Sequence, residues 1–203
     1  MRLFSRRAAL VGGLMLAGVG RRAAAAAAGT PGAVVEAFYA VLLEVMKQAT
    51  SLGFAGRYAR LQPAIETAYA LPLMIRLAVG PQWNTLSPTQ QARLLEAFRR
   101  FTIATYASRF DGYDGEHFEV GGERPQSGGA LVQTRLVLRS ADPVELNYLM
   151  RQDPTWKIID VFLSGTISEL ATRRAEFTSV LRRDGGDGLV ALLERKVADL
   201  NPR

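Results

Sequence analysis

Few residues in this 203-residue sequence could carry out catalysis. His117 is the only histidine, and there is no cysteine. One imidazole beside a surface loop provides neither a metal cluster nor a Ser-His-acid arrangement. The absence of cysteine excludes a thiol nucleophile, a Cys-ligated metal and a disulfide. We therefore predict a protein with no catalytic residues, no metal site and no cofactor.

Asp160 is the residue that could still support proton transfer. It shares one face of a predicted strand with Trp156 and Phe162, and a carboxyl group buried among apolar side chains can act as a general base. No partner base or oxyanion donor stands out beside it. We favour the simpler interpretation, in which Asp160 accepts hydrogen bonds from backbone groups or an arginine. A small-molecule enzyme with a cone-shaped cavity and Asp160 as base is the alternative.

The charge of the chain is concentrated at its start. The formal net charge is +6, but Arg2, Arg6, Arg7, Arg21 and Arg22 lie within the first 28 residues, which contain no acid. Removing these five from the 25 basic residues leaves 20, against 19 acidic ones. Nucleic-acid binding needs a basic surface that neutralises phosphates. Residues 29–203 lack such an excess, so we predict no nucleic-acid partner.

Residues 1–28 are typical of an export signal. A basic start precedes an apolar stretch over residues 8–20, which is too short for a membrane-spanning helix, and small residues at 23–28 offer cleavage sites. The pair Arg6-Arg7 followed by Leu10 partly matches a twin-arginine signal. We predict Sec or twin-arginine export and cleavage, with an uncleaved inner-membrane anchor as the alternative. Residues 29–203 are expected to form a single domain.

Helix-start signals occur on both sides of the chain's centre. The Thr-Pro pair at residues 30–31 predicts an N-cap, and the capping box at Ser87 predicts a helix that reaches Arg109. A second capping box at residues 166–169 begins another helix, and a glycine-rich joint at residues 182–188 separates it from a last one.

Two further helices are predicted between these signals. Apolar residues recur at helical spacing over residues 54–65, with Arg57 and Arg60 turned outward and Pro63 as a possible break. Residues 71–80 are apolar almost all round. A short helix of this kind is either buried in the core or lines an apolar cavity.

The centre of the chain has the two-residue period of β-strands. Alternating apolar residues predict strands at residues 131–139, 144–151 and 156–163, with 118–120 as a fourth, and glycines make 121–129 an exposed loop. Short turns between them favour an antiparallel meander. The predicted fold class is therefore α+β, with a sheet of about four strands covered by helices.

The strand at residues 156–163 is apolar on both faces: Ile159, Val161 and Leu163 on one, and Trp156, Ile158 and Phe162 on the other. A strand of this kind lies centrally and is covered on both sides, or it lines an apolar space. Periodicity alone does not distinguish a filled core from a cavity.

Several strings in the chain match a known family. They are LSPTQQ (86–91), AFRRF (97–101), TYA (105–107), FDGYDG (110–115), DVFL (160–163) and the run 177–192. Over nearly all of the predicted mature chain they resemble the MlaC or toluene-tolerance family of periplasmic lipid carriers. The strings AGRY (55–58), LPLM (71–74), YASRFDGY (106–113) and GTISELATRR (165–174) are most similar to the hopanoid-biosynthesis-associated branch, HpnM.

The resemblance implies a curved antiparallel sheet wrapped by helices, with a deep apolar pocket for lipid tails between them. The head group would stay near the mouth, and no catalytic set is implied. The expected pocket wall is Leu73, Met74, Leu77, Phe98, Phe101, Tyr106, Tyr148, Val161, Leu163, Ile167 and Phe177. Tyr106 and Tyr148 carry hydroxyls that could bond a head group or backbone partners.

The resulting functional prediction is a periplasmic lipid carrier. Its ligand is expected to be a hopanoid or a phospholipid, and its partners are lipid transport complexes of the inner and outer membranes. A membrane-tethered scaffold of the hopanoid pathway that binds no ligand is a further alternative. It would require an uncleaved leader and a solid core.

Overall fold

The computed structural model describes residues 29–126 and 128–201, so the predicted export signal lies outside the described residues. The elements follow one another in this order: α2 (Pro31–Lys47), α3 (Ala49–Ala68), α4 (Leu71–Val79), the 3-10 helix η1 (Gly80–Thr85), α5 (Pro88–Arg109), β1 (His117–Gln126), β2 (Gly129–Val137), β3 (Val144–Gln152), β4 (Trp156–Leu163), β5 (Ile167–Ser168) and α6 (Glu169–Leu200). The α+β prediction is confirmed.

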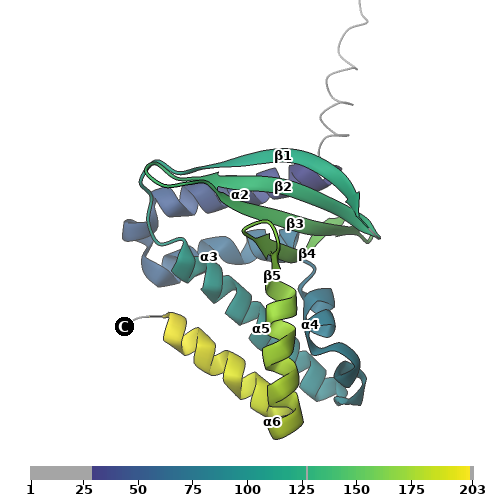
Figure 1. Ribbon diagram of the computed structural model, residues 1–203. Helices are drawn as coiled ribbons and strands as arrows, with labels where there is room; N and C mark the ends of the chain where they lie inside the picture. Colours follow the sequence, from purple (N-terminus) through teal and green to yellow (C-terminus); the bar gives the residue numbers. More distant parts are fainter. Residues whose placement is uncertain (1–28, 127, 202–203) are drawn as a thin grey trace, which may run out of the picture.

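The sheet is an antiparallel meander in the order β1-β2-β3-β4-β5. It is curved and open, and α3, α5 and α6 lie below it in Figure 1. Helix α2 packs on the same concave face, where the Tyr39 hydroxyl lies 2.5 Å from the Thr134 hydroxyl. We call this the helix-covered face. The sheet has one strand more than expected, because the two residues of β5 pair with the end of β4.

A register shift explains the two apolar faces predicted for β4. Leu149 pairs with Asp160 but Met150 pairs with Ile158, so Ile159 is an extra residue that reverses the alternation. Ile158 before the bulge and Val161 after it therefore lie on the same, helix-covered face. The assignment of Ile158 and Val161 to opposite faces was wrong, because strict alternation was applied across the bulge. The edge of β4 that does not pair with β3 is partly covered. One end pairs with β5, and near the other end the Ala70 N–H donates to the Ile158 carbonyl.

Strand β1 replaces most of the loop predicted over residues 121–129. Its register shifts between Val120 and Glu123, and a Cβ on Gly121 would lie 3.2 Å from the Gln133 carbonyl oxygen. These glycines thus form a bulge in a continuous strand. Pro125 is compatible with pairing because β1 is an edge strand, where a missing N–H need not break a ladder.

Two of the three predicted helix caps are confirmed. The Thr30 hydroxyl accepts from the Ala33 N–H at 3.2 Å, and Ser87 forms the predicted capping box of α5. The third cap lies two residues later than expected. Ser168 accepts from the Ala171 N–H, so the preceding residues are free to pair as β5.

A glycine with positive φ interrupts the helical backbone in α3 and in α6. Gly53 in α3 has φ 58° and ψ −177°, and Gly185 in α6 has φ 67° and ψ −169°. Only glycine adopts this region readily. The predicted joint in α6 is thus confirmed, whereas α3 bends at Gly53 and continues as a helix through Pro63.

Arg57 points inward, contrary to the expectation that it faces solvent. Its side chain donates to the carbonyls of Ala107 at 2.8 Å and Ala49 at 3.0 Å, and the residue is 9% exposed. Ala107 lies in the last turn of α5, where carbonyls lack an intrahelical partner. A buried guanidinium is tolerated here because its donors are used by these carbonyls.

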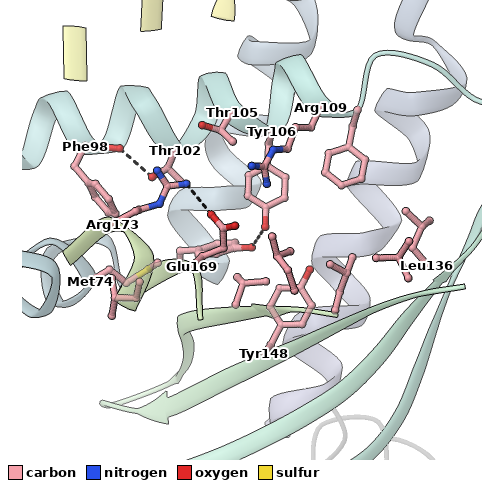
Figure 2. A pocket seen from close by; sticks show the side chains of 17 residues that line it. Met74, Phe98, Thr102, Thr105, Tyr106, Arg109, Leu136, Tyr148, Glu169 and Arg173 are labelled. Carbon is pink, nitrogen blue, oxygen red and sulfur yellow. Dashed lines mark hydrogen bonds and ion pairs between the residues drawn. The ribbon is translucent and has the colours of Figure 1, made fainter. Parts of the chain in front are cut away.

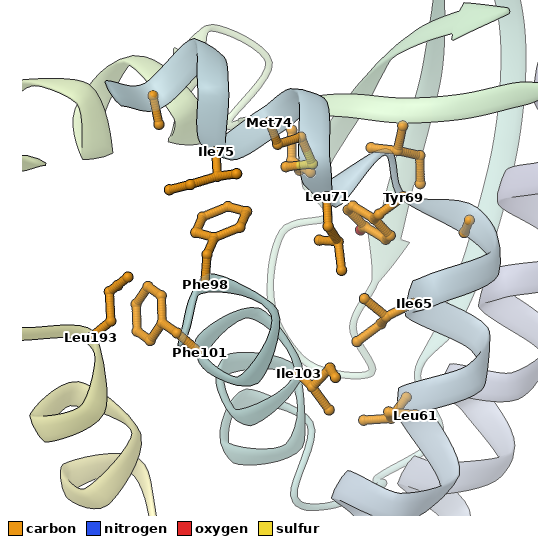
Figure 3. Close-up of a cluster of buried hydrophobic side chains, with 14 of the residues drawn as sticks. Leu61, Ile65, Tyr69, Leu71, Met74, Ile75, Phe98, Phe101, Ile103 and Leu193 are labelled. Carbon is orange, nitrogen blue, oxygen red and sulfur yellow. The ribbon is translucent and has the colours of Figure 1, made fainter. Parts of the chain in front are cut away.

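The helices pack against one another around a solid core. Leu61 and Ile65 of α3, Ile75 of α4 and Ile103 of α5 have no exposed surface. Figure 3 shows Ile103 facing Leu61 and Ile65, and Ile75 beside Phe98. This arrangement fixes α5 in place, with its opposite side turned toward the sheet. The prediction that residues 71–80 are buried or line an apolar cavity holds for one side of α4 only, because Leu77 is 39% exposed.

Candidate functional site

An apolar cavity of about 270 Å³ lies between the helix-covered face of the sheet and helices α5 and α6 (Figure 2). It is lined by Tyr69, Met74, Phe98, Thr102, Thr105, Tyr106, Arg109, Phe110, Leu136, Val144, Leu146, Tyr148, Val161, Leu163, Glu169, Leu170 and Arg173. Its volume lies just below the range of roughly 300–1,000 Å³ that is typical of ligand pockets.

The sheet supplies the apolar wall of this cavity. Leu146 pairs with Leu163, and Tyr148 pairs with Val161, across the β3–β4 ladder. Paired residues project from the same face. The bulge at Ile159 is what brings Val161 and Leu163 onto the cavity side together with Ile158.

Six of the residues predicted to form a pocket wall line the cavity: Met74, Phe98, Tyr106, Tyr148, Val161 and Leu163. Phe101 and Phe177 lie in the adjoining core instead, where the Phe177 ring contacts that of Phe98 edge-on at 6.5 Å. Leu73 and Leu77 line a surface depression beside η1. Ile167 lies on β5 and is 55% exposed. Lipid binding by any of these residues stays a prediction.

Sequence reasoning missed much of the cavity lining. Leu136, Val144 and Leu146 were already on the predicted apolar faces of their strands, and extending the pocket along those faces would have included them. No sequence signal marks Arg109, Glu169 or Arg173 as cavity residues. Glu169 and Arg173 become partly enclosed, and Arg109 comes to lie at the cavity edge, only after α5 and α6 have packed together.

The charged residues form one side of the cavity. Arg173 and Glu169 make an ion pair at 3.1 Å, with exposed side-chain fractions of 19% and 23%. The Arg173 guanidinium also lies 4.6 Å from the centre of the Phe101 ring. Burial lowers the pKa of Arg173, and Glu169 opposes that shift by favouring the charged form. Arg109 is exposed at the edge and makes no ion pair within the described part of the chain.

Tyrosine rings form another part of the cavity wall, where the Tyr106 hydroxyl lies close to Glu169 (Figure 2). The hydroxyls of Tyr69 and Tyr106 are hydrogen-bonded to each other, and the Tyr39 and Tyr148 rings meet edge-on at 5.7 Å. Burial raises the pKa of Tyr69, Tyr106 and Tyr148 above the ordinary value. These side chains are therefore neutral at physiological pH and contribute apolar rings with internally bonded hydroxyls.

The threonines of the helical wall have hydrogen-bond partners within their own helix. Thr102 and Thr105 donate to the carbonyls of Phe98 and Phe101 at 2.9 and 2.7 Å. Among the described residues, no buried side-chain nitrogen or oxygen lacks a hydrogen-bond partner. Away from its charged side, the cavity is thus suited to hydrocarbon and offers few groups that could orient a polar substrate.

Asp160 is not part of the cavity lining. Its carboxylate accepts hydrogen bonds from the Ser168 hydroxyl at 2.5 Å and from the backbone N–H groups of Val161 and Leu170 at 2.8 and 3.0 Å. It therefore joins β4 to the beginning of α6, as the simpler interpretation of the sequence predicts. Over the residues with assigned positions, no group of His, Asp and Glu side chains is arranged to hold a metal ion.

The curved open sheet encloses an apolar cavity against the helices, so the chain is an α+β domain with an internal apolar cavity. A family model described as MlaC protein matches residues 36–195, and the chain belongs to the MlaC family. Across the described ranges, no helix combines the length and the hydropathy needed to cross a bilayer.

The fold is also found in a solved structure. It is similar to the phospholipid-binding protein from Ralstonia solanacearum, which was determined in complex with a phospholipid. The TM-score is 0.75 at 22% sequence identity, and the match covers 85% of this chain and 99% of the other.

Proposed function

We propose that this protein is a periplasmic lipid carrier that holds alkyl chains in the cavity between its sheet and helices α5 and α6. The observation that carries the proposal is the enclosed apolar space lined by strands β2–β4. Membership of the MlaC family supports it, as does the phospholipid named for the similar Ralstonia protein. We further propose that the carrier exchanges lipid with transport complexes of the inner and outer membranes after removal of residues 1–28.

The energetics of alkyl burial suit a carrier. Each buried methylene contributes about 0.8 kcal/mol, so a chain of roughly sixteen carbons gains on the order of ten kcal/mol over exposure to water. A membrane offers a similar gain to the same chain. Transfer in either direction then requires only a small difference in affinity, which docking or cavity opening can provide.

The size and charge of the cavity bear on its cargo. At about 270 Å³ it would have to widen to admit two chains or a polycyclic ring system completely. Arg109 at its edge would attract a phosphate, which favours a phospholipid. The similarity of residues 165–174 to the hopanoid-associated branch favours a hopanoid. Both cargos belong to the proposal, and extraction of bound lipid distinguishes them.

Two other functions fit the structure less well. An enzyme that uses Asp160 as base would need that carboxylate to face the cavity, whereas it is bonded to Ser168 and Leu170. A scaffold without ligand would need a solid core, whereas a cavity lies beside Val161 and Tyr148. The carrier is the function that makes use of the apolar cavity.

Extraction of the purified protein tests the proposal. We expect mild purification of residues 29–203, followed by solvent extraction and mass spectrometry, to release one lipid per protein. Val161→Trp should fill the cavity and abolish this lipid, whereas Leu77→Trp, on the exposed side of α4, should retain it. A folded wild-type protein that binds no lipid, before or after incubation with vesicles, would contradict the carrier.

A further inference from the structure

A second apolar depression lies between helices α2 and α3, on the other side of the tyrosine cluster. It has a volume of about 620 Å³ and is more open to solvent than the cavity beneath the sheet. Its lining is Ala33, Val34, Ala37, Phe38, Val41, Arg60, Pro63, Ala64, Thr67, Ala68, Thr155, Trp156 and Lys157. We call it the α2–α3 groove.

The groove exposes apolar side chains that a helix pair would ordinarily bury. Val34, Val41, Ala64 and Trp156 are only partly buried there, although each packs against the core. Trp156 reaches the groove because it lies on the helix-covered face of β4, two residues before Ile158. Covering apolar surface in a concave site with an apolar ligand removes that surface from water, which favours binding.

The charges on the groove have one sign. Arg60 and Lys157 line it, and no acidic side chain does so in the part of the chain that the structure describes. The Lys157 ammonium donates to the Thr67 carbonyl, which holds it beside the apolar floor. The Arg60 side chain makes no ion pair with any described residue. An apolar floor with cations at its edge is complementary to an alkyl chain that ends in an anion.

Phe38 separates the groove from the cavity beneath the sheet. Its side chain lines the groove, and its ring meets those of Tyr69 and Tyr106 edge-on at 5.5 and 5.3 Å. Tyr69 and Tyr106 in turn line the cavity. The two apolar spaces therefore lie back to back across a wall of aromatic rings, and a ligand in one need not exclude a ligand in the other.

We infer that the α2–α3 groove is a second binding site, which takes a single-chain anionic amphiphile of the fatty-acid type. The chain lies along Val34, Val41 and Trp156, and the anionic end pairs with Arg60 and Lys157. This site is distinct from the proposed carrier cavity and does not depend on it.

Binding stoichiometry tests the second site. Residues 29–203, stripped of lipid, would be titrated with hexadecanoate below its critical micelle concentration and measured by native mass spectrometry and calorimetry. We expect two equivalents for the wild type. Ala64→Trp should fill the groove and leave one equivalent, whereas Ala59→Trp, an exposed alanine of the same helix outside the groove, should keep two.

The head-group contact is tested separately. Arg60→Gln should weaken groove binding of hexadecanoate by about threefold, because exposed charge pairs contribute little. Its effect on hexadecanol, which has the same chain without the charge, should be smaller than twofold. These measurements would be made in Val161→Trp protein, in which only the groove remains open.

The outcomes separate this inference from the carrier proposal. A single equivalent that Val161→Trp abolishes and Ala64→Trp retains would overturn the second site and keep the carrier. A single equivalent that Ala64→Trp abolishes and Val161→Trp retains would keep the second site and overturn the carrier. Equal binding of hexadecanoate by Ala64→Trp and Ala59→Trp would overturn the second site whatever the total.

Discussion

Helix α5 borders two apolar regions that differ in how they are filled. On one side Ile103 faces Leu61 and Ile65 of α3 with no exposed surface (Figure 3). On the other side Thr102 and Thr105 face the sheet across the cavity (Figure 2). Helices pack closely enough for their side chains to interdigitate. The curved sheet stands away from α5, and the short threonines do not fill the space between them.

The comparison teaches that apolar composition does not decide whether a core is solid. Both regions are built from Leu, Ile, Val and aromatic residues. The difference lies in the shape of the facing element and in the length of a few side chains on α5. The first two predictions below set a residue of the solid region against one that lines the cavity. The others test the tyrosine wall and the solvent-facing side of α5, and all follow in order of decreasing expected effect.

Truncation should cost most in the solid region. Ile103→Ala should lower the free energy of unfolding by about 3–4 kcal/mol, because it creates a cavity among fixed neighbours. Leu163→Ala, which enlarges a space that already exists, should cost about 1 kcal/mol. Urea denaturation of both variants with lipid removed measures the difference. Equal losses would mean that the two regions are packed alike.

Enlarging a side chain should also cost more stability in the solid region than beside the cavity. Ala78→Leu adds volume to a position of α4 with no exposed surface and should cost about 2 kcal/mol through overpacking. Val161→Leu adds volume toward the cavity and should change stability by less than about 1 kcal/mol. Thermal unfolding at fixed pH tests the pair. A larger loss for Val161→Leu would show that the cavity wall is rigid.

The tyrosine pair tests the wall shared by the cavity and the α2–α3 groove. Tyr106→Phe should cost about 1–2 kcal/mol, because the buried Tyr69 hydroxyl loses its partner. Tyr113→Phe provides the control, since Tyr113 is 45% exposed and its hydroxyl can bond to water. Chemical denaturation compares the two. A loss no larger than that of the control would exclude a structural role for the hydroxyl pair.

The solvent-facing side of α5 should give the smallest effect. The hydrogen bond from Arg99 lowers the pKa of Glu96 from 4.5 to about 2. A lowered pKa in the folded state means that ionised Glu96 stabilises the protein above about pH 4.5, and that this contribution is lost as the pH falls toward 2. Because Glu96 is 44% exposed, we expect about 0.5 kcal/mol.

Glu96→Gln tests whether ionised Glu96 stabilises the folded protein. The stability difference from wild type should be present at pH 6 and should disappear near pH 2, as measured by urea denaturation across that range. Glu44→Gln is the control, because Glu44 is 58% exposed and pairs with Lys47 alone. A difference that grows toward acid pH would contradict the stabilising role of Arg99.

The sequence predicted the elements better than it predicted the cavity. The cap at Thr30, the capping box at Ser87 and the joint at Gly185 each depend on local chemistry, and each is present. The alternation in β3 also placed Leu146 and Tyr148 on one face. Local signals of this kind do not depend on how distant parts of the chain pack.

The cavity depends on contacts that local signals do not specify. The bulge at Ile159 turns Val161 toward the helices, and a simple count along the strand assigned the faces differently. Arg57 is buried because two helix carbonyls accept its donors, which no pattern within α3 indicates. Phe101 and Phe177 have the spacing expected of a wall but fall on the solid side of the packed helices.

The order of the strands has a consequence for how the chain folds. Every ladder of the sheet joins strands that are neighbours in the sequence, so the sheet forms by closing short loops. By contrast, α2 reaches the sheet through contacts such as that between Gly32 and Glu123, which are 91 residues apart. Other helices also dock through distant contacts, such as that between Arg93 and Asp187, which are 94 residues apart. The entropic cost of loop closure is therefore paid mainly when the helices dock onto the sheet and onto one another.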